Sequence, residues 1–185
     1  KWAIWAGING LGKSYGGVAQ VARSCVSAMV AETDGVPLRR LVSLLESDAS
    51  RYSDLQKVEG CRVTLCWKNR LRFLLAVARQ FVERPDLVLY DHVDLAQCQS
   101  VLPRRMRRPH VVWVHGVEVW KSLPNRKLKA LQTAELLIFN SEFTLRRFRE
   151  FHGDGFNCVV VPLCADLAGD ATPLDCDREP WILTV

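Results

Sequence analysis

Residues that could bind a phosphate lie near the start of the chain, where five glycines fall within eleven positions: Gly7, Gly10, Gly12, Gly16 and Gly17. They follow an apolar run, residues 2–6, whose residue types favour a strand. An apolar, mostly uncharged series then predicts a helix that starts at Gly17 or Val18. A glycine loop between a strand and a helix points backbone N–H groups and the positive end of the helix dipole at an anion. We therefore predict a phosphate site on Gly16 and Gly17.

The same loop matches a second phosphate-binding pattern. Residues 7–14 fit the P-loop spacing letter for letter, and residues 86–91 resemble the acidic strand that usually accompanies it. A P-loop helix follows its lysine, here Lys13, almost directly, which would place Gly16 and Gly17 in the first helical turn. Each would cost about 1 kcal/mol relative to alanine there. The double glycine is therefore the favoured site, and a P-loop or a turn that binds nothing are the alternatives.

Other residues whose side chains could take part in binding or catalysis follow the later predicted strands: Asp91, His92, His115, Glu118, Trp120 and Asn140. His115 comes after an apolar strand and before a glycine, so it is either a reactive group or a histidine that satisfies backbone groups at a strand end. Ser141 is expected to cap a helix, because no base accompanies it. No His, Cys or Asp cluster has metal-ligand spacing, so no metal is expected.

Several of these residues have two interpretations. Asp91 and His92 could orient an acceptor hydroxyl or act as a general base, or they could cap a helix that begins near Asp94. Glu118 and Trp120 fit a sugar-binding edge, with one accepting hydroxyl hydrogen bonds and the other offering an apolar face. Packing of Trp120 within its loop is an equal alternative.

The elements that must position these residues alternate along the chain. Apolar runs predict strands at residues 2–6, 38–45, 61–66, 87–90, 109–114, 134–139 and 157–161. Helical patterns lie between most of them. Strict alternation with continuous apolar strands predicts an α/β fold, a Rossmann-like doubly wound parallel sheet of about seven strands covered on both faces. Ligands of such sheets bind beyond the carboxyl ends of the strands, which brings the residues above to one rim.

Two segments carry more local expectations. Residues 67–83 have helical spacing, with a predicted apolar side of Leu71, Leu74, Leu75, Ala78 and Val82. Lys68, Arg72 and Arg79 are expected to face solvent. Residues 46–60 are polar and are expected to form an exposed loop with one short helix.

The composition fits one α/β domain. The chain has 185 residues, 49% of them hydrophobic and 24% charged, which is ordinary for a globular protein. Its seven cysteines are scattered, odd in number and without a C-x-x-C pair, which indicates reduced thiols in a cytosolic setting. The net charge of +5 permits contact with phosphates or an anionic membrane. Nucleic acid is not expected, since no binding module is recognisable.

Five segments occur in an order that resembles a known family: residues 16–22, 85–92, 114–120, 137–144 and 159–166. Together they resemble the N-terminal half of GT-B-fold glycosyltransferases of family 4, retaining enzymes that use nucleotide-sugar donors. The resemblance implies that residues 1–176 are the acceptor-side Rossmann-like domain. Residues 177–185 would be a linker and the truncated first strand of a C-terminal donor domain.

The resemblance also implies roles and partners. Gly16 and Gly17 would lie near the donor's diphosphate and His115 near the transferred sugar, in a metal-independent reaction without a tightly bound cofactor. The donor would be a nucleotide-diphosphate sugar and the acceptor a glycan or a lipid-linked molecule, in cell-surface polysaccharide or lipopolysaccharide biosynthesis. The 185 residues alone would not transfer sugar, because the family's donor contacts come mostly from the second domain. The alternatives are a P-loop-type nucleotide-binding module and a non-catalytic phosphosugar-binding Rossmann-like domain.

Basic residues gather in two clusters, residues 104–108 and 146–149, with further cations at Lys121, Arg126, Lys127 and Lys129. They could dock on anionic lipid headgroups, as suits an enzyme with a lipid-linked acceptor. The alternative is solvated helix faces. The expected location is cytoplasmic, with peripheral contact at the inner face of the cytoplasmic membrane.

Overall fold

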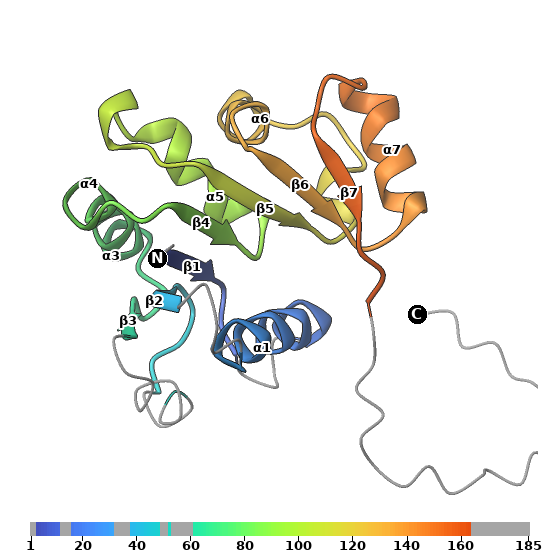
Figure 1. Cartoon of the computed structure of the whole chain (residues 1–185). Coiled ribbons are helices and arrows are strands. Elements are labelled where there is room, and N and C mark those ends of the chain that lie inside the picture. Colours follow the sequence, from blue (N-terminus) through green and yellow to red (C-terminus); the bar gives the residue numbers. More distant parts are fainter. Residues whose placement is uncertain (1–2, 12–15, 32–37, 49–51, 53–60, 164–185) are drawn as a thin grey trace, which may run out of the picture.

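Seven parallel strands form one sheet in the computed structural model, which describes residues 3–11, 16–31, 38–48, 52 and 61–163 (Figure 1). The strands are β1 (Ile4–Ile8), β2 (Leu38–Ser43), β3 (Arg62–Leu65), β4 (Leu87–Tyr90), β5 (His110–Val114), β6 (Leu136–Phe139) and β7 (Cys158–Val160). Their order across the sheet is β3-β2-β1-β4-β5-β6-β7, and every neighbouring pair is parallel. The predicted Rossmann-like α/β fold with a seven-stranded parallel sheet is confirmed.

The strand order reverses between β1 and β4. The chain passes from β1 outward to β2 and β3, returns to β4, and then continues in the opposite direction. Right-handed connections place helices on opposite faces for these two directions. The helices are α1 (Gly16–Ala31), α3 (Arg70–Ala78), α4 (Gln80–Glu83), α5 (Val93–Val101), α6 (Asn125–Gln132) and α7 (Glu142–His152), with short 3-10 turns η3 (Arg104–Met106) and η4 (Val117–Val119). Figure 1 shows α1 on one side of the sheet and α5, α6 and α7 on the other.

Each face of the sheet has its own core. The larger one, on the face of α3 to α7, includes Val88, Val112, Leu137, Phe139 and Phe148. The smaller one, on the face of α1, includes Ala6, Ile8, Ala22, Val26 and Leu38. Cys158 and Val160 of β7 pack against the larger core, so Val159 points to the α1 face, where it is 38% exposed. Within the described residues, the predicted cover of both faces is therefore incomplete at the β7 end.

The helix predicted over residues 67–83 begins later and is divided. Trp67 and Lys68 form a turn with φ of 50° and 60°, and Asn69 caps α3 by accepting a hydrogen bond from the backbone N–H of Arg72 at 3.0 Å. Arg84 ends α4 in the left-handed conformation, with φ of 46°. The two residues before the cap could not join the helix, because positive φ is incompatible with helical geometry.

The buried side of α3 also differs from the predicted one. Three members of the predicted apolar side are exposed: Leu71, Leu75 and Val82. The side chains that α3 buries are instead Phe73, Ala76 and Val77. Ala76 and Val77 are small enough to let the helix approach the sheet. The ring of Phe73 there lies 3.2 Å from the position that a Cβ on Gly7 would occupy. The segment has two apolar sides, and packing selects the one that the periodicity did not favour.

The segment predicted as an exposed loop, residues 46–60, is described only in part. Glu46 and Tyr52 are both buried, which contradicts the expected exposure at these two positions. The hydroxyl of Tyr52 donates a hydrogen bond to Ser43 Oγ at 3.0 Å, so its polar atom is satisfied inside the smaller core.

The described part of the chain contains neither a helix that could span a membrane nor a disulfide. None of its helices combines the length and apolar character needed to cross a bilayer. Its five cysteines are free thiols, as predicted. Burial raises the pKa of Cys25 and Cys66 to about 11, so these thiols are protonated at neutral pH.

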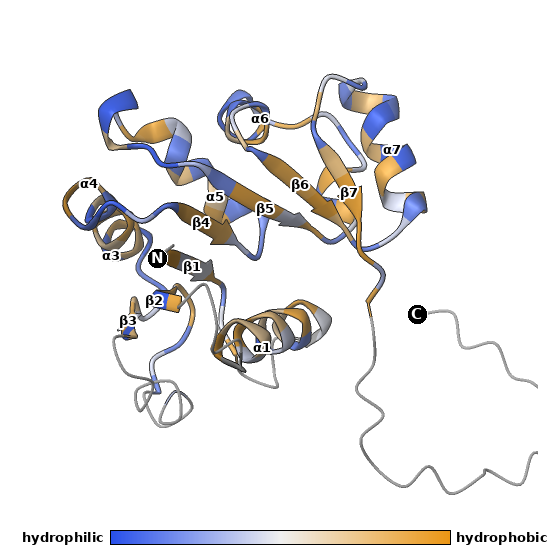
Figure 2. Cartoon of the chain, viewed as in Figure 1, coloured by the Kyte–Doolittle hydropathy of each residue, from blue (hydrophilic) through white to orange (hydrophobic). Residues whose placement is uncertain are grey.

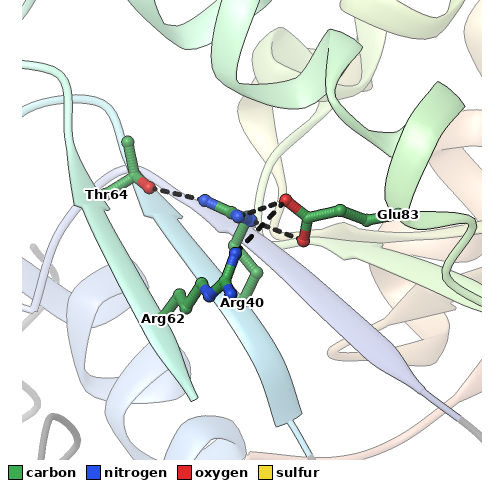
Figure 3. A network of polar contacts seen from close by, with 4 residues as sticks. All are labelled: Arg40, Arg62, Thr64 and Glu83. Atoms are coloured by element: carbon green, nitrogen blue, oxygen red, sulfur yellow. Dashed lines mark hydrogen bonds and ion pairs between the residues drawn. The ribbon is translucent and has the colours of Figure 1, made fainter. Parts of the chain in front are cut away.

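A buried arginine joins β2 to α4 (Figure 3). The guanidinium of Arg40 is almost fully buried, forms an ion pair with Glu83 and donates to Thr64 Oγ1 at 3.1 Å. It also lies over the ring of Trp5, 5.0 Å from the ring centroid. Arg62 approaches the same Glu83 carboxylate at 3.9 Å. This network fixes the end of α4 against the sheet.

Removing the carboxylate should therefore destabilise the fold. We expect Glu83→Ala to lower the free energy of unfolding by about 2–3 kcal/mol, because it leaves the buried Arg40 charge without a counterion. The value lies below that of a fully enclosed pair because Glu83 is 30% exposed. Urea unfolding measures the change. Glu150→Ala, which removes an exposed partner of Arg147, is the matched control and should cost less than about 0.5 kcal/mol; equal losses in both variants would contradict the account.

Candidate functional site

The ends of β1 and β4 are joined by Asp91, at the point where the strand order reverses. Its backbone N–H donates to the Gly7 carbonyl at 3.0 Å, and its Oδ2 accepts from the Asn9 N–H at 2.9 Å. The side chain is buried, and Oδ1 has no hydrogen-bond partner among the described residues. Burial raises the pKa of Asp91 to about 8, although the Asn9 N–H opposes this shift. The carboxyl group is therefore mostly protonated at neutral pH.

His115 is oriented by the same residue. Its Nε2 lies 2.6 Å from the Asp91 carbonyl oxygen, and since a carbonyl only accepts, Nε2 carries the hydrogen. Burial lowers the pKa of His115, so the ring is neutral at pH 7 and its Nδ1 is an acceptor. The alternative of a histidine that satisfies a backbone group is thus realised at Nε2. The same bond fixes the ring in one orientation for any contact made by Nδ1.

Glu118 closes the loop after β5. One carboxylate oxygen accepts the His115 backbone N–H at 2.6 Å and the other accepts the Gly116 N–H at 2.8 Å. Both oxygens are therefore engaged in holding the loop. The sugar-binding role remains a prediction, and any hydroxyl would have to share these oxygens.

His92 and Trp120 have structural roles of their own. His92 caps α5, since its Nδ1 accepts the Asp94 N–H at 3.1 Å, and its ring stacks on His115 with centroids 6.1 Å apart. Trp120 meets Phe143 edge to face, with centroids 5.3 Å apart. These contacts match the capping and packing alternatives for the two residues.

The two residues that follow β6 are a rim residue, Asn140, and a helix cap, Ser141. Ser141 caps α7 as predicted, because its Oγ accepts the Thr144 N–H at 3.2 Å. Asn140, directly before it, has a buried Oδ1 without a hydrogen-bond partner in the described part of the chain. Its predicted place on the rim after β6 holds, and its contact with a ligand remains a prediction.

Trp113 connects the histidine to the glycine end of α1, and the sequence did not single it out. Its ring lies beside that of His115, with centroids 6.4 Å apart and planes 14° from parallel. It also lines a cavity of about 880 Å³ together with Gly17, Arg23 and Leu163. Within an apolar strand a tryptophan is typical of a core, so only its partial exposure and its neighbours reveal this position.

The N-terminus of α1 carries the positive end of the helix dipole. The helix begins at Gly16, one residue before the predicted start, and its first turn has no acidic residue. Gly17 is exposed, and a Cβ built there would meet nothing within 4 Å. Lys13 and Ser14 of the P-loop pattern lie outside the described residues. Gly7 of that pattern lies inside β1, where a Cβ would come within 2.8 Å of the Tyr90 ring, so packing accounts for this glycine.

A second cavity, of about 400 Å³, lies between α3 and α5 at the carboxyl edge of the sheet. Its lining combines cations and apolar groups and includes Asn9, Leu44, Lys68, Arg70, Leu74 and Val101. Asp94 also lines it and is paired with Lys127, and this cation lowers the pKa of Asp94 against the opposing effect of burial. This cavity was not predictable from the sequence, because its walls come from four separate segments of the chain. Among the described residues, no group of three or more His, Cys, Asp or Glu is placed to hold a metal ion.

Comparisons with known proteins agree with the fold. No protein-family model matches the chain, and no curated protein matches it. Two crystal structures of Alr3699/HepE from Anabaena are similar, one in complex with UDP and one with UDP and glucose, each with a TM-score of 0.56. Sequence identity is 14% and 15%, over 88% of this chain. The chain spans only 44% of the HepE length, and at this identity the likeness shows a shared Rossmann-like α/β fold.

The raised pKa of Asp91 predicts a pH-dependent stability. Unfolded, this carboxyl has a pKa near 3.8, so between pH 3.8 and about 8 the folded state binds more protons than the unfolded state. The free energy of unfolding should therefore fall as pH rises through this window, by up to about 1.4 kcal/mol per pH unit from this group. We expect Asp91→Asn to flatten that dependence, since an amide keeps an oxygen for the Asn9 N–H and carries no charge.

Urea unfolding of both proteins at several pH values measures the effect. The difference between the two stability profiles gives the contribution of Asp91 alone. The lowered pKa of His115 affects the free energy of unfolding in both proteins, and it does so at acid pH. Parallel stability profiles for the wild type and Asp91→Asn would contradict a buried, protonated carboxyl group.

Proposed function

We propose that this chain is the acceptor-side half of a GT-B-type retaining glycosyltransferase of family 4, which takes its sugar from a nucleotide-diphosphate donor. The observation that carries the proposal is at the glycine N-terminus of α1, where the exposed Gly17 lines a cavity together with Trp113, whose ring lies beside the oriented ring of His115. The likeness to HepE supports it, because UDP and glucose are the components of a nucleotide sugar. The 44% share of HepE suits one half of a two-domain enzyme.

The donor's diphosphate is assigned to the N-terminus of α1. The N–H groups of Gly16 and Gly17, in the first turn, have no partner within the helix, and together with the helix dipole they offer the diphosphate a positive site. Arg23 lines the same cavity and adds a full positive charge. In a retaining transfer the diphosphate leaves with additional negative charge, so donors fixed at this position stabilise the transition state more than the ground state.

His115 is assigned to the transferred sugar. With Nε2 bound to the Asp91 carbonyl, Nδ1 can accept a hydrogen bond from a sugar hydroxyl without reorientation of the ring. A neutral ring suits this role, because an imidazolium would have no acceptor. The stacking of His92 and Trp113 on the ring keeps it in place.

The acceptor is assigned to the cavity between α3 and α5. Lys68 and Arg70 at its mouth suit a phosphate, and Leu44, Leu74 and Val101 suit an apolar chain. A lipid-linked acceptor of cell-surface polysaccharide or lipopolysaccharide assembly combines these two chemistries, and such a reaction belongs on the cytoplasmic side of the membrane. A P-loop nucleotide-binding module is the second candidate, and the buried packing of Gly7 counts against it.

Binding of UDP-glucose to the 185-residue chain tests the diphosphate site. We expect Gly17→Ala to bind as the wild type does, because space is open there and helical geometry is kept. Gly17→Asp should weaken binding about tenfold or more, since a carboxylate would occupy the phosphate position. Lys13→Ala should have little effect. Tight binding of ATP or GTP with magnesium that Lys13→Ala abolishes would instead establish the P-loop module.

Turnover tests the role of His115. In a longer native polypeptide that carries this chain and a donor domain, we expect His115→Ala to lower kcat about 10²-fold, as loss of a positioning contact does. Thermal unfolding checks that the variant is folded. Full activity in a folded His115→Ala protein would contradict the assignment, and sugar binding without any transfer would favour the non-catalytic phosphosugar-binding domain.

A further inference from the structure

An apolar surface remains uncovered on the outer side of α3 and α4. Its members are Trp67, Leu71, Leu75, Phe81 and Val82. Leu71, Leu75 and Val82 are 63%, 60% and 77% exposed, and their spacing places them along one side of a nearly continuous helix. Figure 2 shows hydrophobic ribbon on α3 and α4 at the outer edge of the helical layer. We call these five residues with their cationic neighbours the α3–α4 face.

The cations that border this apolar surface have almost no acidic counterpart. Between residues 67 and 84 the cations are Lys68, Arg70, Arg72, Arg79 and Arg84, and all five are exposed. The one acid in this range is Glu83, and its carboxylate is already bound to the buried Arg40 (Figure 3). The α3–α4 face therefore presents positive charge that no side chain of its own segment neutralises.

Neighbouring elements extend the positive border. The 3-10 turn η3 packs against α4, and Arg108 donates to the Gln80 carbonyl at 3.3 Å. Arg104 and Arg105 of η3 are exposed, so the basic cluster seen in the sequence adjoins the apolar surface. Cations and apolar groups also alternate at close range, because Arg72, Leu75 and Arg79 line one groove of about 290 Å³. The guanidinium of Arg72 lies over the Trp67 ring, 4.3 Å from its centroid.

We propose that the α3–α4 face binds the surface of an anionic lipid bilayer. An exposed line of Trp, Leu, Phe and Val flanked by Lys and Arg is the arrangement of helices that lie in a membrane interface. The apolar side chains enter the headgroup boundary while the cations meet lipid phosphates. Charge complementarity favours this occupant over a second copy of the chain, since a second copy would oppose like charges.

This docking surface does not depend on the proposed glycosyl transfer, although it suits a lipid-linked acceptor. Arg70 and Leu74 of α3, with Lys68 of the turn before it, also line the cavity assigned to the acceptor. A bilayer on the α3–α4 face would therefore lie at the mouth of that cavity. Of the two basic clusters in the sequence, the α3–α4 face adjoins residues 104–108, and the experiment below tests it against residues 146–149 of α7.

Vesicle co-sedimentation of the 185-residue chain tests the proposal. We expect binding to vesicles of phosphatidylcholine mixed with phosphatidylglycerol, weaker binding at high salt, and little binding to phosphatidylcholine alone. The double variant Leu71→Glu/Leu75→Glu should bind about tenfold less or worse, and both sites are exposed enough to accept the change. Arg72→Gln/Arg79→Gln should lose the preference for phosphatidylglycerol, and it tests the same face without altering the apolar surface.

The matched control is Phe151→Glu, an identical type of change at an exposed residue of α7, beside Arg147. It should bind vesicles as the wild type does. Loss of binding in Phe151→Glu but not in the Leu variants would overturn the proposal in favour of α7. No binding by the wild type would also overturn it, as would a wild-type dimer in light scattering that the Leu variants dissociate.

Discussion

The junction of β1, β4 and β5 at their carboxyl ends is the constraint on which the rest of this molecule depends. β1 and β4 are paired as far as Gly7 and Tyr90, but the strand order reverses between them, so the segments that follow the two strands lead to helices on opposite faces of the sheet. Asp91 connects these segments: it bonds to Gly7 of β1 and to Asn9, just after β1, and its carbonyl oxygen accepts the hydrogen bond from His115 Nε2. A carboxyl group is well suited to this task once it is protonated, because an isolated buried charge would be costly.

The candidate site follows from that junction. Because α1 follows β1, one of the two strands at this reversal, its glycine end lies near the same junction, and Gly17 is exposed there. Trp113 lines a cavity with Gly17 of α1, and its ring lies beside His115. It therefore links the helix that follows β1 with the histidine that follows β5. Among the described residues, His92, Glu118 and Ser141 bond to backbone N–H groups, while no hydrogen bond is made by His115 Nδ1.

The sequence predicted the sheet well because parallel strands buried on both faces are continuous apolar runs that are easily distinguished from helices. It also placed the rim residues correctly, since each follows a strand. It failed where two apolar sides compete, as in α3, because periodicity cannot tell which side packs until the position of Gly7 and Tyr90 is known. It failed again at Tyr52 and Glu46, whose burial depends on long-range packing, and at Trp113, whose role comes from neighbours distant in the sequence.

The central claim is that the glycine end of α1 and the β5 end form one site for a nucleotide sugar. Backbone-amide and indole NMR signals of the 185-residue chain, recorded during titration with UDP-glucose, test it most directly. We expect the largest shifts on the amides of Gly16 and Gly17 and on the indole N–H of Trp113, with a smaller shift at His115. Shifts confined to Lys13 and its neighbours, or to the cavity between α3 and α5, would contradict it.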